Sequence, residues 1–379
     1  MKLLVANRGE VAVRVLRAAA ELGIDTVAIY SKDDESCLHT GKADEAVALD
    51  GVGPSAYLNA DAIIEAAATN GCDAIHPGYG FLAEKASFAR ACADADITFV
   101  GPDADGLAKA ENKVAMRAAV EELGVPVLPG TDGGVTPAQV AELLGAHAEG
   151  IVLKPVAGGG GRGLRLVTNT DELESSFEQA TSEATAAFGS PDLYAEAWRP
   201  GRHVEVQVIG DSNGALTHLG TVDCSLQRSF QKLIDIAPAP ALSRSVVDEL
   251  TSGALQIAAS IGLSNAATVE FLIAGEEIAF IEVNARLEVE HAVTEAVSGV
   301  DLVQAQLQLA SGASLVELGL GDPDALRARG YAVGARVCME SVQRDGALRP
   351  ETGTLRVYEA PSGPGIRTDG FAYRGYETS

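Results

Sequence analysis

The chain has 379 residues, 47% of them hydrophobic, and its 53 acidic side chains outnumber 28 basic ones, giving a formal net charge of −25. This length predicts two or three domains, and no apolar run approaches the ~20 residues that cross a bilayer. The acidic charge disfavours nonspecific binding to nucleic acid or anionic membrane. Five scattered cysteines without C-x-x-C spacing indicate neither a disulfide framework nor a zinc site. The start, MKLLVANRGE, reaches charged residues too early for a signal peptide, so we expect a cytoplasmic protein.

Residues 1–101 alternate short apolar strands with helices. KLLVA, TVAIYS, DAIHP and ITFVGP are typical of strands, whereas VAVRVLRAAAELG, DAIIEAAA and KASFARACADA are typical of helices. This alternation predicts a mostly parallel, doubly wound sheet with ligand loops at the carboxyl ends of its strands. The two candidate loops are NRGE, residues 7–10, and HPGYGFLAE, residues 76–84.

A helix is expected over ENKVAMRAAVEELG, residues 111–124, and beyond it lies the glycine-rich stretch KPVAGGGGRGLRLV, residues 154–167. Glycine amides carry no Cβ beside them and can turn toward an anion such as phosphate. Strand-like sequence on both sides does not fit a Rossmann fingerprint, and the lysine precedes the glycines, unlike that of a P-loop. A glycine-tipped hairpin over a nucleotide remains, between the helices AQVAELLGAHA and DELESSFEQATSEATAAF in a small α+β lid; a hairpin without a ligand is the alternative.

The most informative segment is TVEFLIAGEEIAFIEVNARLEVEH, residues 268–291. AGEE is a turn signal, and a hairpin centred near Glu276 brings Glu270 opposite Glu282. Carboxylates and amides within reach of one another are hard oxygen ligands suited to Mg²⁺, although a solvated strand face is the alternative. Period-two alternation places these polar side chains on one side of the second strand: Glu282, Asn284, Arg286, Glu288 and Glu290.

Two further segments carry polar residues that suit a site. In DCSLQRSFQK, residues 223–232, Arg228 and Lys232 either add positive charge to an acidic pocket or lie on the surface. GRHVEVQVIG, residues 201–210, alternates as a strand does, and its His203 is either a core histidine or a ligand. A final β-rich segment contains YAVGARVCME and TLRVYEA, and we expect it to be incomplete because its strands have no obvious closing partners.

Ten short motifs follow one another along the chain: ANRGE, HPGYGFLAE, the glycine run with its leading lysine, RHVEVQV, DCSLQR, QK, APAP, VEFL, EVNARLEVEH and GVDLV. Together they resemble the biotin carboxylase component of biotin-dependent carboxylases, which are ATP-grasp enzymes. LASGASLVELGL and PETGTLRVYEAPSGPGIRTDGF are similar to pyruvate carboxylases and long single-chain acyl-CoA carboxylases. The resemblance implies an α/β and α+β chain: a doubly wound N-terminal domain over residues 1–111, an ATP-grasp domain over 112–325 with a lid at about 129–200, and the start of a β-rich C-terminal domain over 326–379.

The reaction implied by the resemblance is ATP-dependent carboxylation of biotin by bicarbonate, through carboxyphosphate. The expected cofactors are ATP, Mg²⁺ or Mn²⁺, and biotin on a separate carrier domain, with bicarbonate as substrate. The expected partners are that carrier and a carboxyltransferase domain or subunit of an acyl-CoA-type carboxylase, in a homo-oligomer or large complex, without nucleic acid or membrane. The alternatives are a pyruvate or urea-type carboxylase component, a carbamoyl-phosphate-type ligase, and a non-catalytic scaffold that binds nucleotide.

The resemblance also implies roles for individual positions. Glu290 matches the base that deprotonates bicarbonate, and Arg336 matches the residue that stabilises the biotin enolate, where an always-charged guanidinium fits developing oxyanion charge. Lys232 and Arg286 match bicarbonate contacts, beside Glu288 and Val289. Glu270, Glu282 and Asn284 match metal positions. The nucleotide and biotin cleft is matched by Lys113, Lys154, Gly158, Gly159, Gly160, Gly161, Gly163, Glu196, His203, Gln227, Tyr79 and Gly80.

Several positions depart from the family pattern, and the first of them is Glu288, where the family has glutamine. Two like charges ~4 Å apart repel by about 4 kcal/mol at an effective dielectric near 20. We therefore expect weaker oxyanion binding unless Glu288 is protonated or paired with Arg286. The other departures are Ser229 and Phe230 for Arg-His, which removes a polar contact near biotin and nucleotide, Ala197 for a hinge lysine, and Ala292 for a proline.

Overall fold

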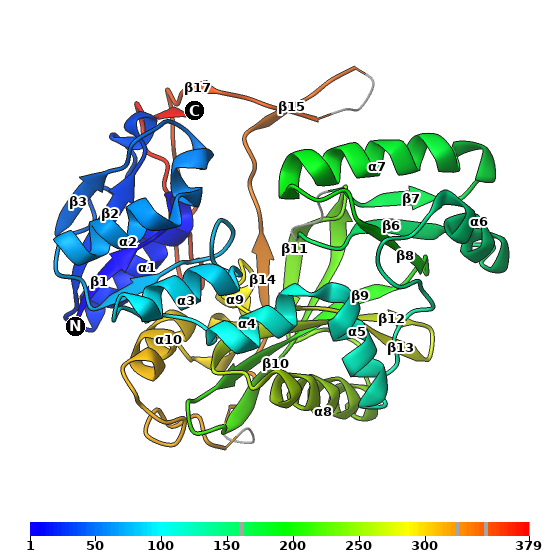
Figure 1. Cartoon of the computed structure of the whole chain (residues 1–379). Helices are drawn as coiled ribbons and strands as arrows, with labels where there is room; N and C mark the ends of the chain where they lie inside the picture. The colour runs from blue at the N-terminus through cyan, green and yellow to red at the C-terminus, as the bar shows by residue number, and fades with distance from the viewer. Residues whose placement is uncertain (159–162, 323–325, 345–347, 379) are drawn as a thin grey trace. The chain divides into compact units, whose positions relative to one another are not determined.

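The computed structural model describes residues 1–158, 163–322, 326–344 and 348–378 (Figure 1). The chain divides into two compact units. The first comprises Met1–Ala104, Asp301–Ala313 and Arg336–Ser379, and the second comprises Asp105–Val300 and Ser314–Ala335. The domain boundaries expected at residues 111 and 325 stay predictions. In the described part of the chain, none of the helices has the length and apolar character that a bilayer crossing requires.

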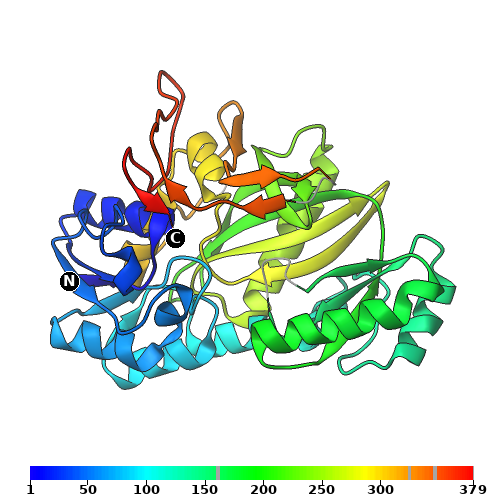
Figure 2. The same cartoon turned by 90° about the horizontal axis from the view of Figure 1, so that it is seen from above.

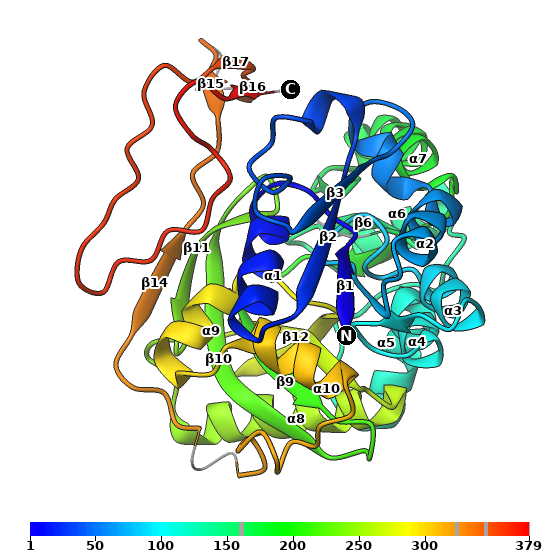
Figure 3. The ribbon, with the colours of Figure 1, turned by 90° about the vertical axis from the view of Figure 1, so that its left-hand side faces the viewer.

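A five-stranded parallel sheet organises the first unit, as the alternation of strands and helices predicts. Its strand order is β3-β2-β1-β4-β5. Helix α1 lies on one side of the sheet, and α2 and α3 lie on the other (Figure 3). The sequence patterns did not indicate β3. The bounds are β1 Lys2–Val5, α1 Gly9–Glu21, β2 Asp25–Tyr30, η1 Lys32–Asp34, β3 Glu45–Ala48, η2 Pro54–Leu58, α2 Ala60–Thr69, β4 Ala74–His76, α3 Ala86–Asp94 and β5 Thr98–Phe99.

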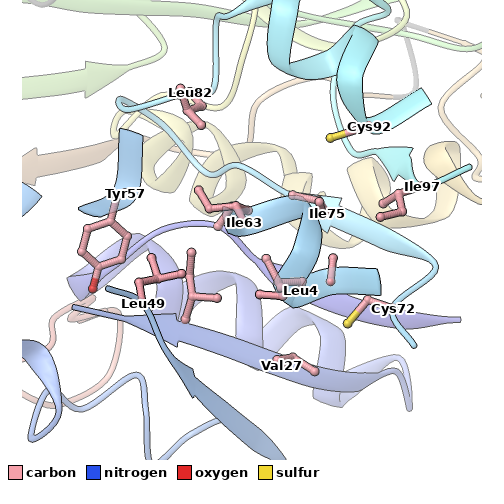
Figure 4. Packing of buried hydrophobic residues seen from close by; sticks show 14 of the residues in the cluster. Leu4, Val27, Leu49, Tyr57, Ile63, Cys72, Ile75, Leu82, Cys92 and Ile97 are labelled. Carbon is pink, nitrogen blue, oxygen red and sulfur yellow. The ribbon is translucent and has the colours of Figure 1, made fainter. Parts of the chain in front are cut away.

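The core of the first unit lies between the sheet and helices α2 and α3 (Figure 4). Alternate residues of each strand enter it, as the two-residue period of a strand requires, and Leu4, Val27 and Ile75 have no exposed surface. Tyr57 stacks on Phe81 at the rim, with ring centroids 5.2 Å apart. Each fully buried large apolar side chain contributes about 1.5–3 kcal/mol.

One carboxylate of the first unit serves two partners. Asp301 Oδ1 accepts a hydrogen bond from the backbone N–H of Gln304 at 2.8 Å, which caps helix α10, Leu302–Ala310. The same oxygen accepts from Nη2 of the buried Arg14 of α1 at 2.7 Å. Asp301 therefore fixes the start of one helix and compensates a buried charge on another.

A six-stranded sheet organises the second unit, in the order β13-β12-β9-β10-β11-β14, and all its pairings are antiparallel. Helix α8 packs against strands β9, β10 and β12. The bounds are α4 Ala104–Glu111, α5 Lys113–Glu122, β9 Arg202–Gly210, β10 Leu216–Arg228, β11 Gln231–Ala237, α8 Arg244–Ile261, β12 Asn265–Ala274, β13 Glu277–Asn284, α9 His291–Ser298 and β14 Ala332–Ala335.

A three-stranded sheet, in the order β7-β6-β8, carries the glycine-rich stretch and is called the small sheet below. The expected hairpin is present, since β6 pairs antiparallel with β7 from Ile151 opposite Val167 to Leu153 opposite Arg165. Both expected helices are present, and α7 runs along one face of the small sheet (Figure 2). The bounds are α6 Pro137–Ala146, β6 Ile151–Pro155, β7 Arg165–Val167, η3 Thr170–Glu172, α7 Leu173–Phe188 and β8 Leu193–Ala197.

The hairpin of β12 and β13 has the predicted register at its centre, with Glu270 directly opposite Glu282. The expectation that polar alternation continues along the second strand to Glu290 is wrong, because β13 ends at Asn284 and α9 begins at His291. Residues 285–288 are all buried, so their alternation does not separate a buried face from an exposed one.

The last part of the chain contains short paired strands rather than the longer ones that the pattern suggested. TLRVYEA contributes Thr354 alone to a strand, and the rest of that motif is irregular. Its apolar residue Val357 is 72% exposed, so no packing holds the segment extended against a sheet. The bounds are β15 Glu340–Val342, β16 Leu348–Pro350, β17 Gly353–Thr354 and β18 Glu377–Thr378.

Replacing Asp301 is predicted to destabilise the first unit through both of its contacts. Asp301→Ala removes a helix cap, worth about 1 kcal/mol, and also removes an ion pair to buried Arg14, so we expect a loss of stability larger than that of a cap alone. Asp301→Asn retains the cap acceptor, so we expect a smaller loss. The control Asn59→Ala removes only the exposed cap of α2, where Asn59 accepts from Ala62 N–H. Calorimetry measures the free energy of unfolding of all three variants. A loss of stability in Asp301→Ala that is no larger than the loss in Asn59→Ala would contradict the prediction.

Candidate active site

Lys232 of β11 lies at the centre of an acidic cluster in the second unit. Its Nζ is 2.6 Å from Glu205 Oε2, 2.7 Å from Glu270 Oε1 and 3.7 Å from Glu290 Oε1. The lysine side chain is 12% exposed, and each of the three carboxylate side chains is 4% exposed or less. We call these four residues the Lys232 cluster. One buried cation thus faces three buried carboxylates, which is a charge arrangement that a fold maintains only at some energetic cost.

The charges within the Lys232 cluster shift one another's protonation. Burial alone would lower the pKa of Lys232, but Glu205, Glu270 and Glu290 hold it well above its usual value. Burial alone would raise the pKa of Glu270, but Lys232 and His203 hold it well below its usual range. Burial and the neighbouring carboxylates raise the pKa of Glu205 despite Lys232. The cluster therefore contains a firmly charged lysine and carboxylates with unequal proton affinities.

Three oxygen-bearing side chains on adjacent strands form a group suited to a divalent cation. Glu270 and Glu282 face each other across β12 and β13, and Asn284 Nδ2 donates to Glu270 Oε1 at 2.7 Å. Burial would raise the pKa of Glu282, but its ion pair with Lys113 holds that pKa below its usual value. A buried and a half-buried carboxylate opposite each other, each paired with a lysine, and an amide oxygen beside them match the oxygen preference of Mg²⁺.

A second lysine and carboxylate pair lies on the small sheet. Lys154 of β6 forms an ion pair with Glu196 of β8, and Arg117 Nε is 3.6 Å from that carboxylate. Lys154 Nζ also lies 5.9 Å from the centroid of the Tyr194 ring, within the range of a cation–π contact. Lys154 and Lys113 are thus each held by a carboxylate of the same unit.

The glycine run begins at a position that only glycine occupies without strain. Gly158 has φ +129°, and a Cβ there would lie 2.5 Å from the ring of Phe188. Gly163 also has positive φ, at +73°. The proposed phosphate-binding residues Gly159, Gly160 and Gly161 lie outside the described residues.

His203 lies beside the Lys232 cluster rather than in the hydrophobic core, and its role as a ligand stays a prediction. Its Nδ1 accepts from Gln227 Nε2 at 2.7 Å, so its Nε2–H donates to Glu270 Oε2 at 2.6 Å. This chain of hydrogen bonds orients the Glu270 carboxylate from the side opposite Lys232.

Arg286 forms an ion pair with Glu288, which is one of the two possibilities expected for the glutamate. Nη1 of Arg286 is 2.9 Å from Glu288 Oε2 and also donates to the Leu287 carbonyl at 3.2 Å. Burial raises the pKa of Glu288 to about 7, since Arg286 and Lys232 only partly offset it and the nearby carboxylates of Glu290 and Glu270 add to it. Val289 follows directly and is half-buried.

Phe230 makes an aromatic contact in place of the polar one that the family sequence provides. It lies in the turn between β10 and β11, where Ser229 and Phe230 both have positive φ, at +50° and +61°. Its ring meets the edge of Trp198, with centroids 6.4 Å apart and an interplanar angle of 86°. Such a pair contributes about 0.5–1.5 kcal/mol beyond burial, and here it joins the turn to the end of β8.

The remaining predicted site residues belong to the first unit. Tyr79 donates its hydroxyl to Glu10, and its backbone carbonyl accepts from Asn7 Nδ2 at 2.8 Å. Gly80 follows with φ +72°. Arg336 is the first residue of the C-terminal segment of this unit.

Sequence reasoning missed several residues that lie in or beside the site. Glu205 could have been found, since it shares the face of an alternating strand with His203 and Gln207. Cys224 and Asp235 lie with Glu290 in a group whose ligand atoms are within 4.8 Å of one another. Burial holds the pKa of the Cys224 thiol well above its usual value, which disfavours the thiolate that a metal would need.

A glycine-bearing small sheet beside a larger antiparallel sheet that carries lysines and paired carboxylates defines an ATP-grasp domain. Residues 112–318 match the family model described as carbamoyl-phosphate synthase L chain, ATP binding domain. Residues 1–107 match the model of the biotin carboxylase N-terminal domain. The chain belongs to the biotin carboxylase family, as the resemblance of its motifs indicates.

Characterised relatives agree with this assignment. Pyruvate carboxylase 1 of Caenorhabditis elegans is 47% identical over 374 residues, covering 97% of this chain and 32% of that protein. Biotin carboxylase 1 of Bacillus subtilis (strain 168) is 42% identical over 384 residues, covering 99% of this chain and 83% of that protein. The chain therefore spans 32% of the pyruvate carboxylase but most of the biotin carboxylase.

Two solved structures show the same fold. The biotin carboxylase domain of the Hydrogenobacter thermophilus 2-oxoglutarate carboxylase, in complex with MgADP, ADP and bicarbonate, superposes with a TM-score of 0.94 at 40% identity, covering all of this chain and 83% of that one. A single-chain, multi-domain long-chain acyl-CoA carboxylase superposes with a TM-score of 0.87 at 41% identity, covering 36% of its own chain. The ATP-grasp fold expected from the sequence is confirmed.

Removing the charge of Lys232 is predicted to make stability strongly dependent on pH. In Lys232→Met the buried carboxylates lose the cation that favours their ionised forms, so their folded-state pKa values rise above the unfolded ones. The free energy of unfolding of Lys232→Met is then expected to be about 3–5 kcal/mol below that of wild type at neutral pH. This deficit grows as the pH rises and shrinks as the carboxylates are protonated on acidification.

Melting temperatures of Lys232→Met, Lys232→Arg and wild type between about pH 5 and 9 test this expectation. Lys232→Arg keeps the charge and should follow the wild-type profile more closely. Lys109→Met is the control, because Lys109 is exposed. Its described contact is a hydrogen bond from Nζ to the Ser260 carbonyl at 3.3 Å. A Lys232→Met deficit that is constant over the pH range would contradict the electrostatic explanation.

Proposed function

We propose that this chain carboxylates biotin on a carrier domain, using bicarbonate and ATP, as the biotin carboxylase component of a larger carboxylase. The observation that carries the proposal is the Lys232 cluster, in which a buried cation and the buried carboxylate of Glu290 lie 3.7 Å apart. A cation that holds an oxyanion beside a carboxylate that takes its proton is the arrangement that activation of bicarbonate requires.

Lys113 and Lys154 are proposed to bind the phosphates of ATP. Each is held by a carboxylate, Glu282 and Glu196 respectively, and a triphosphate would offer each ammonium a more concentrated negative charge. The glycine run between β6 and β7 supports this role, because its backbone amides lack obstructing side chains. Glu270, Glu282 and Asn284 are the residues that would hold Mg²⁺ or Mn²⁺, which supplies neutralisation of charge on the transferring phosphoryl group.

In the proposed reaction Lys232 and Arg286 hold the bicarbonate anion, and Glu290 accepts the proton of its hydroxyl group. The freed oxygen forms a bond to the γ-phosphorus of ATP while the bond from that phosphorus to the ADP oxygen breaks, which yields ADP and carboxyphosphate. The carboxyl carbon of carboxyphosphate then forms a bond to a ureido nitrogen of biotin, while its C–O bond to phosphate breaks and the released phosphate takes the proton from that nitrogen. Arg336 of the first unit is proposed to place its permanent charge beside the ureido oxygen of biotin.

The partners and the final acceptor follow by analogy with the relatives. Pyruvate, 2-oxoglutarate and long-chain acyl-CoA carboxylases are all named among them, and the chain covers about a third of the multidomain ones. We propose a biotin carrier and a carboxyltransferase, in the same polypeptide or another, as its partners in a cytoplasmic acyl-CoA-type or pyruvate-type carboxylase. A non-catalytic nucleotide-binding role is the second candidate, favoured by the ion pair between Glu288 and Arg286.

ADP release distinguishes these functions. With ATP, Mg²⁺ and free biotin, we expect turnover that depends on bicarbonate. Glu290→Gln should lower that turnover by about 10²–10⁴-fold, the usual contribution of a general base, and leave ATP binding intact. ATP binding without any turnover in the wild type would favour the non-catalytic role.

The two phosphate-binding lysines are tested in the same assay. Lys113→Met and Lys154→Met each remove one point charge from the triphosphate, and we expect the KM for ATP to rise at least tenfold, about 1.4 kcal/mol. The exposed Lys109→Met is the matched control and should behave as wild type. An unchanged KM for ATP in both variants would exclude the proposed phosphate contacts.

A further inference from the structure

The carboxylate of Glu288 forms an ion pair with Arg286, which is one of the two side chains proposed to bind the substrate oxyanion. Its carboxylate lies on Nη1 of Arg286 at 2.9 Å, and both side chains are 10% exposed. A carboxylate and a bicarbonate share one shape, a planar carbon with two or three oxygens and a single negative charge. Both satisfy the same guanidinium donors, so the chain itself supplies an analogue of the ligand.

The position of Arg286 leaves it little freedom to serve both anions. Its Nη1 also donates to the Leu287 carbonyl at 3.2 Å, and its Nη2 donates to Asn284 Oδ1 at 3.4 Å. The guanidinium is therefore fixed from its own loop and from the end of β13. A bicarbonate that binds Nη1 must therefore displace the Glu288 carboxylate or share that nitrogen with it.

The neighbouring charges do not compensate a second anion. Lys232 of β11 faces Glu205 of β9, Glu270 of β12 and Glu290 of the same loop as Glu288, and His203 of β9 is bonded to Glu270. Ionised Glu288 and a bound bicarbonate ~4 Å apart would repel by about 4 kcal/mol at an effective dielectric near 20. A neutral Glu288 carboxyl would instead donate its O–H to the oxyanion and no longer compete with it for Arg286 as an anion.

We propose that Glu288 is a specificity-determining residue that competes with bicarbonate for Arg286, so that the oxyanion binds when Glu288 is neutral and is rejected when it is ionised. This inference rests on the proposed function, because it concerns the same oxyanion site. The pKa of Glu288, raised to about 7 by burial, places the change near neutral pH. Since a carboxyl group is neutral below its pKa, bicarbonate binding weakens as the pH rises through about 7.

The test compares wild type with Glu288→Gln, in which an uncharged amide replaces the carboxyl group. A second variant, Glu288→Ala, removes the charge without introducing an amide, and so shows whether an effect of Glu288→Gln comes from the amide itself. Sodium bicarbonate is the probe, and its stabilising effect on the melting temperature is measured at about pH 6 and pH 8.5 in sealed cells. The KM for bicarbonate in ADP release is measured at the same pH values. Glu277→Gln, at the exposed start of β13, removes one carboxylate outside the site and is the matched control.

We expect the wild type and Glu277→Gln to bind bicarbonate more weakly at the higher pH, by up to about tenfold per pH unit above the pKa of one linked group. Both Glu288 variants should lose this linked dependence, and Glu288→Gln should bind more tightly than wild type at the higher pH. Equal bicarbonate affinities of wild type and Glu288→Gln at both pH values would overturn the inference, as would weaker binding by Glu288→Gln.

The two readouts separate this inference from the proposed function. If Glu288→Gln shows tighter, pH-insensitive binding in the melting assay while no variant releases ADP, the competition stands and the proposed reaction fails. If ADP release depends on bicarbonate but Glu288→Gln keeps the wild-type pH profile in both assays, the reaction stands and the competition fails.

Discussion

The structure of the second unit depends on a buried lysine that holds three carboxylates together. Lys232 comes from β11, whereas Glu205 and Glu270 come from β9 and β12, so the contact joins three strands of the large sheet. Without that cation the carboxylates would repel one another in a medium that screens poorly. The same principle holds at Lys113 and Lys154, each of which has a carboxylate partner. In the proposed function, an anionic ligand would take the place of the carboxylates that now hold these lysines.

Sequence patterns predicted the parts of the site that depend on local geometry. The turn AGEE predicted the hairpin and the pair Glu270 and Glu282, although the structure reaches that pair through a register shift between Glu270 and Phe271. The same period wrongly predicted that the strand continues over residues 285–290. Residues 285–288 are all buried, so their polar alternation does not mark an exposed face of a strand. Helix α8 was missed although its ends carry clear signals, the cap Ser243 and the left-handed Gly262. The contacts of Lys232 with Glu205 and of Phe230 with Trp198 join separate strands and turns, so spacing could not reveal them.

In the first unit a single side chain ties together the two candidate loops predicted from the sequence. The loops at the carboxyl ends of β1 and β4 are tied together by Asn7, whose Nδ2 donates to the carbonyls of Pro77 and Tyr79 at 2.7 and 2.8 Å. A Cβ on Gly78 would lie 2.9 Å from that nitrogen, so glycine is required for the approach. These two loops were candidates for ligand binding by position alone. Their described contacts make the strand ends a fixed support for the adjoining Tyr79 and Gly80.

The edge-to-face contact of Trp198 with Phe230 has a consequence for how the molecule can be observed. Trp198 is the one tryptophan of the sequence, and it directly follows the last residue of β8. Its indole emission responds to the packing and polarity around that ring, and the ring adjoins the turn between β10 and β11. The native chain thus carries a single tryptophan where the small sheet adjoins the turn between β10 and β11 of the large sheet, and its indole emission, excited selectively over that of the eight tyrosines, follows this contact in solution without a label.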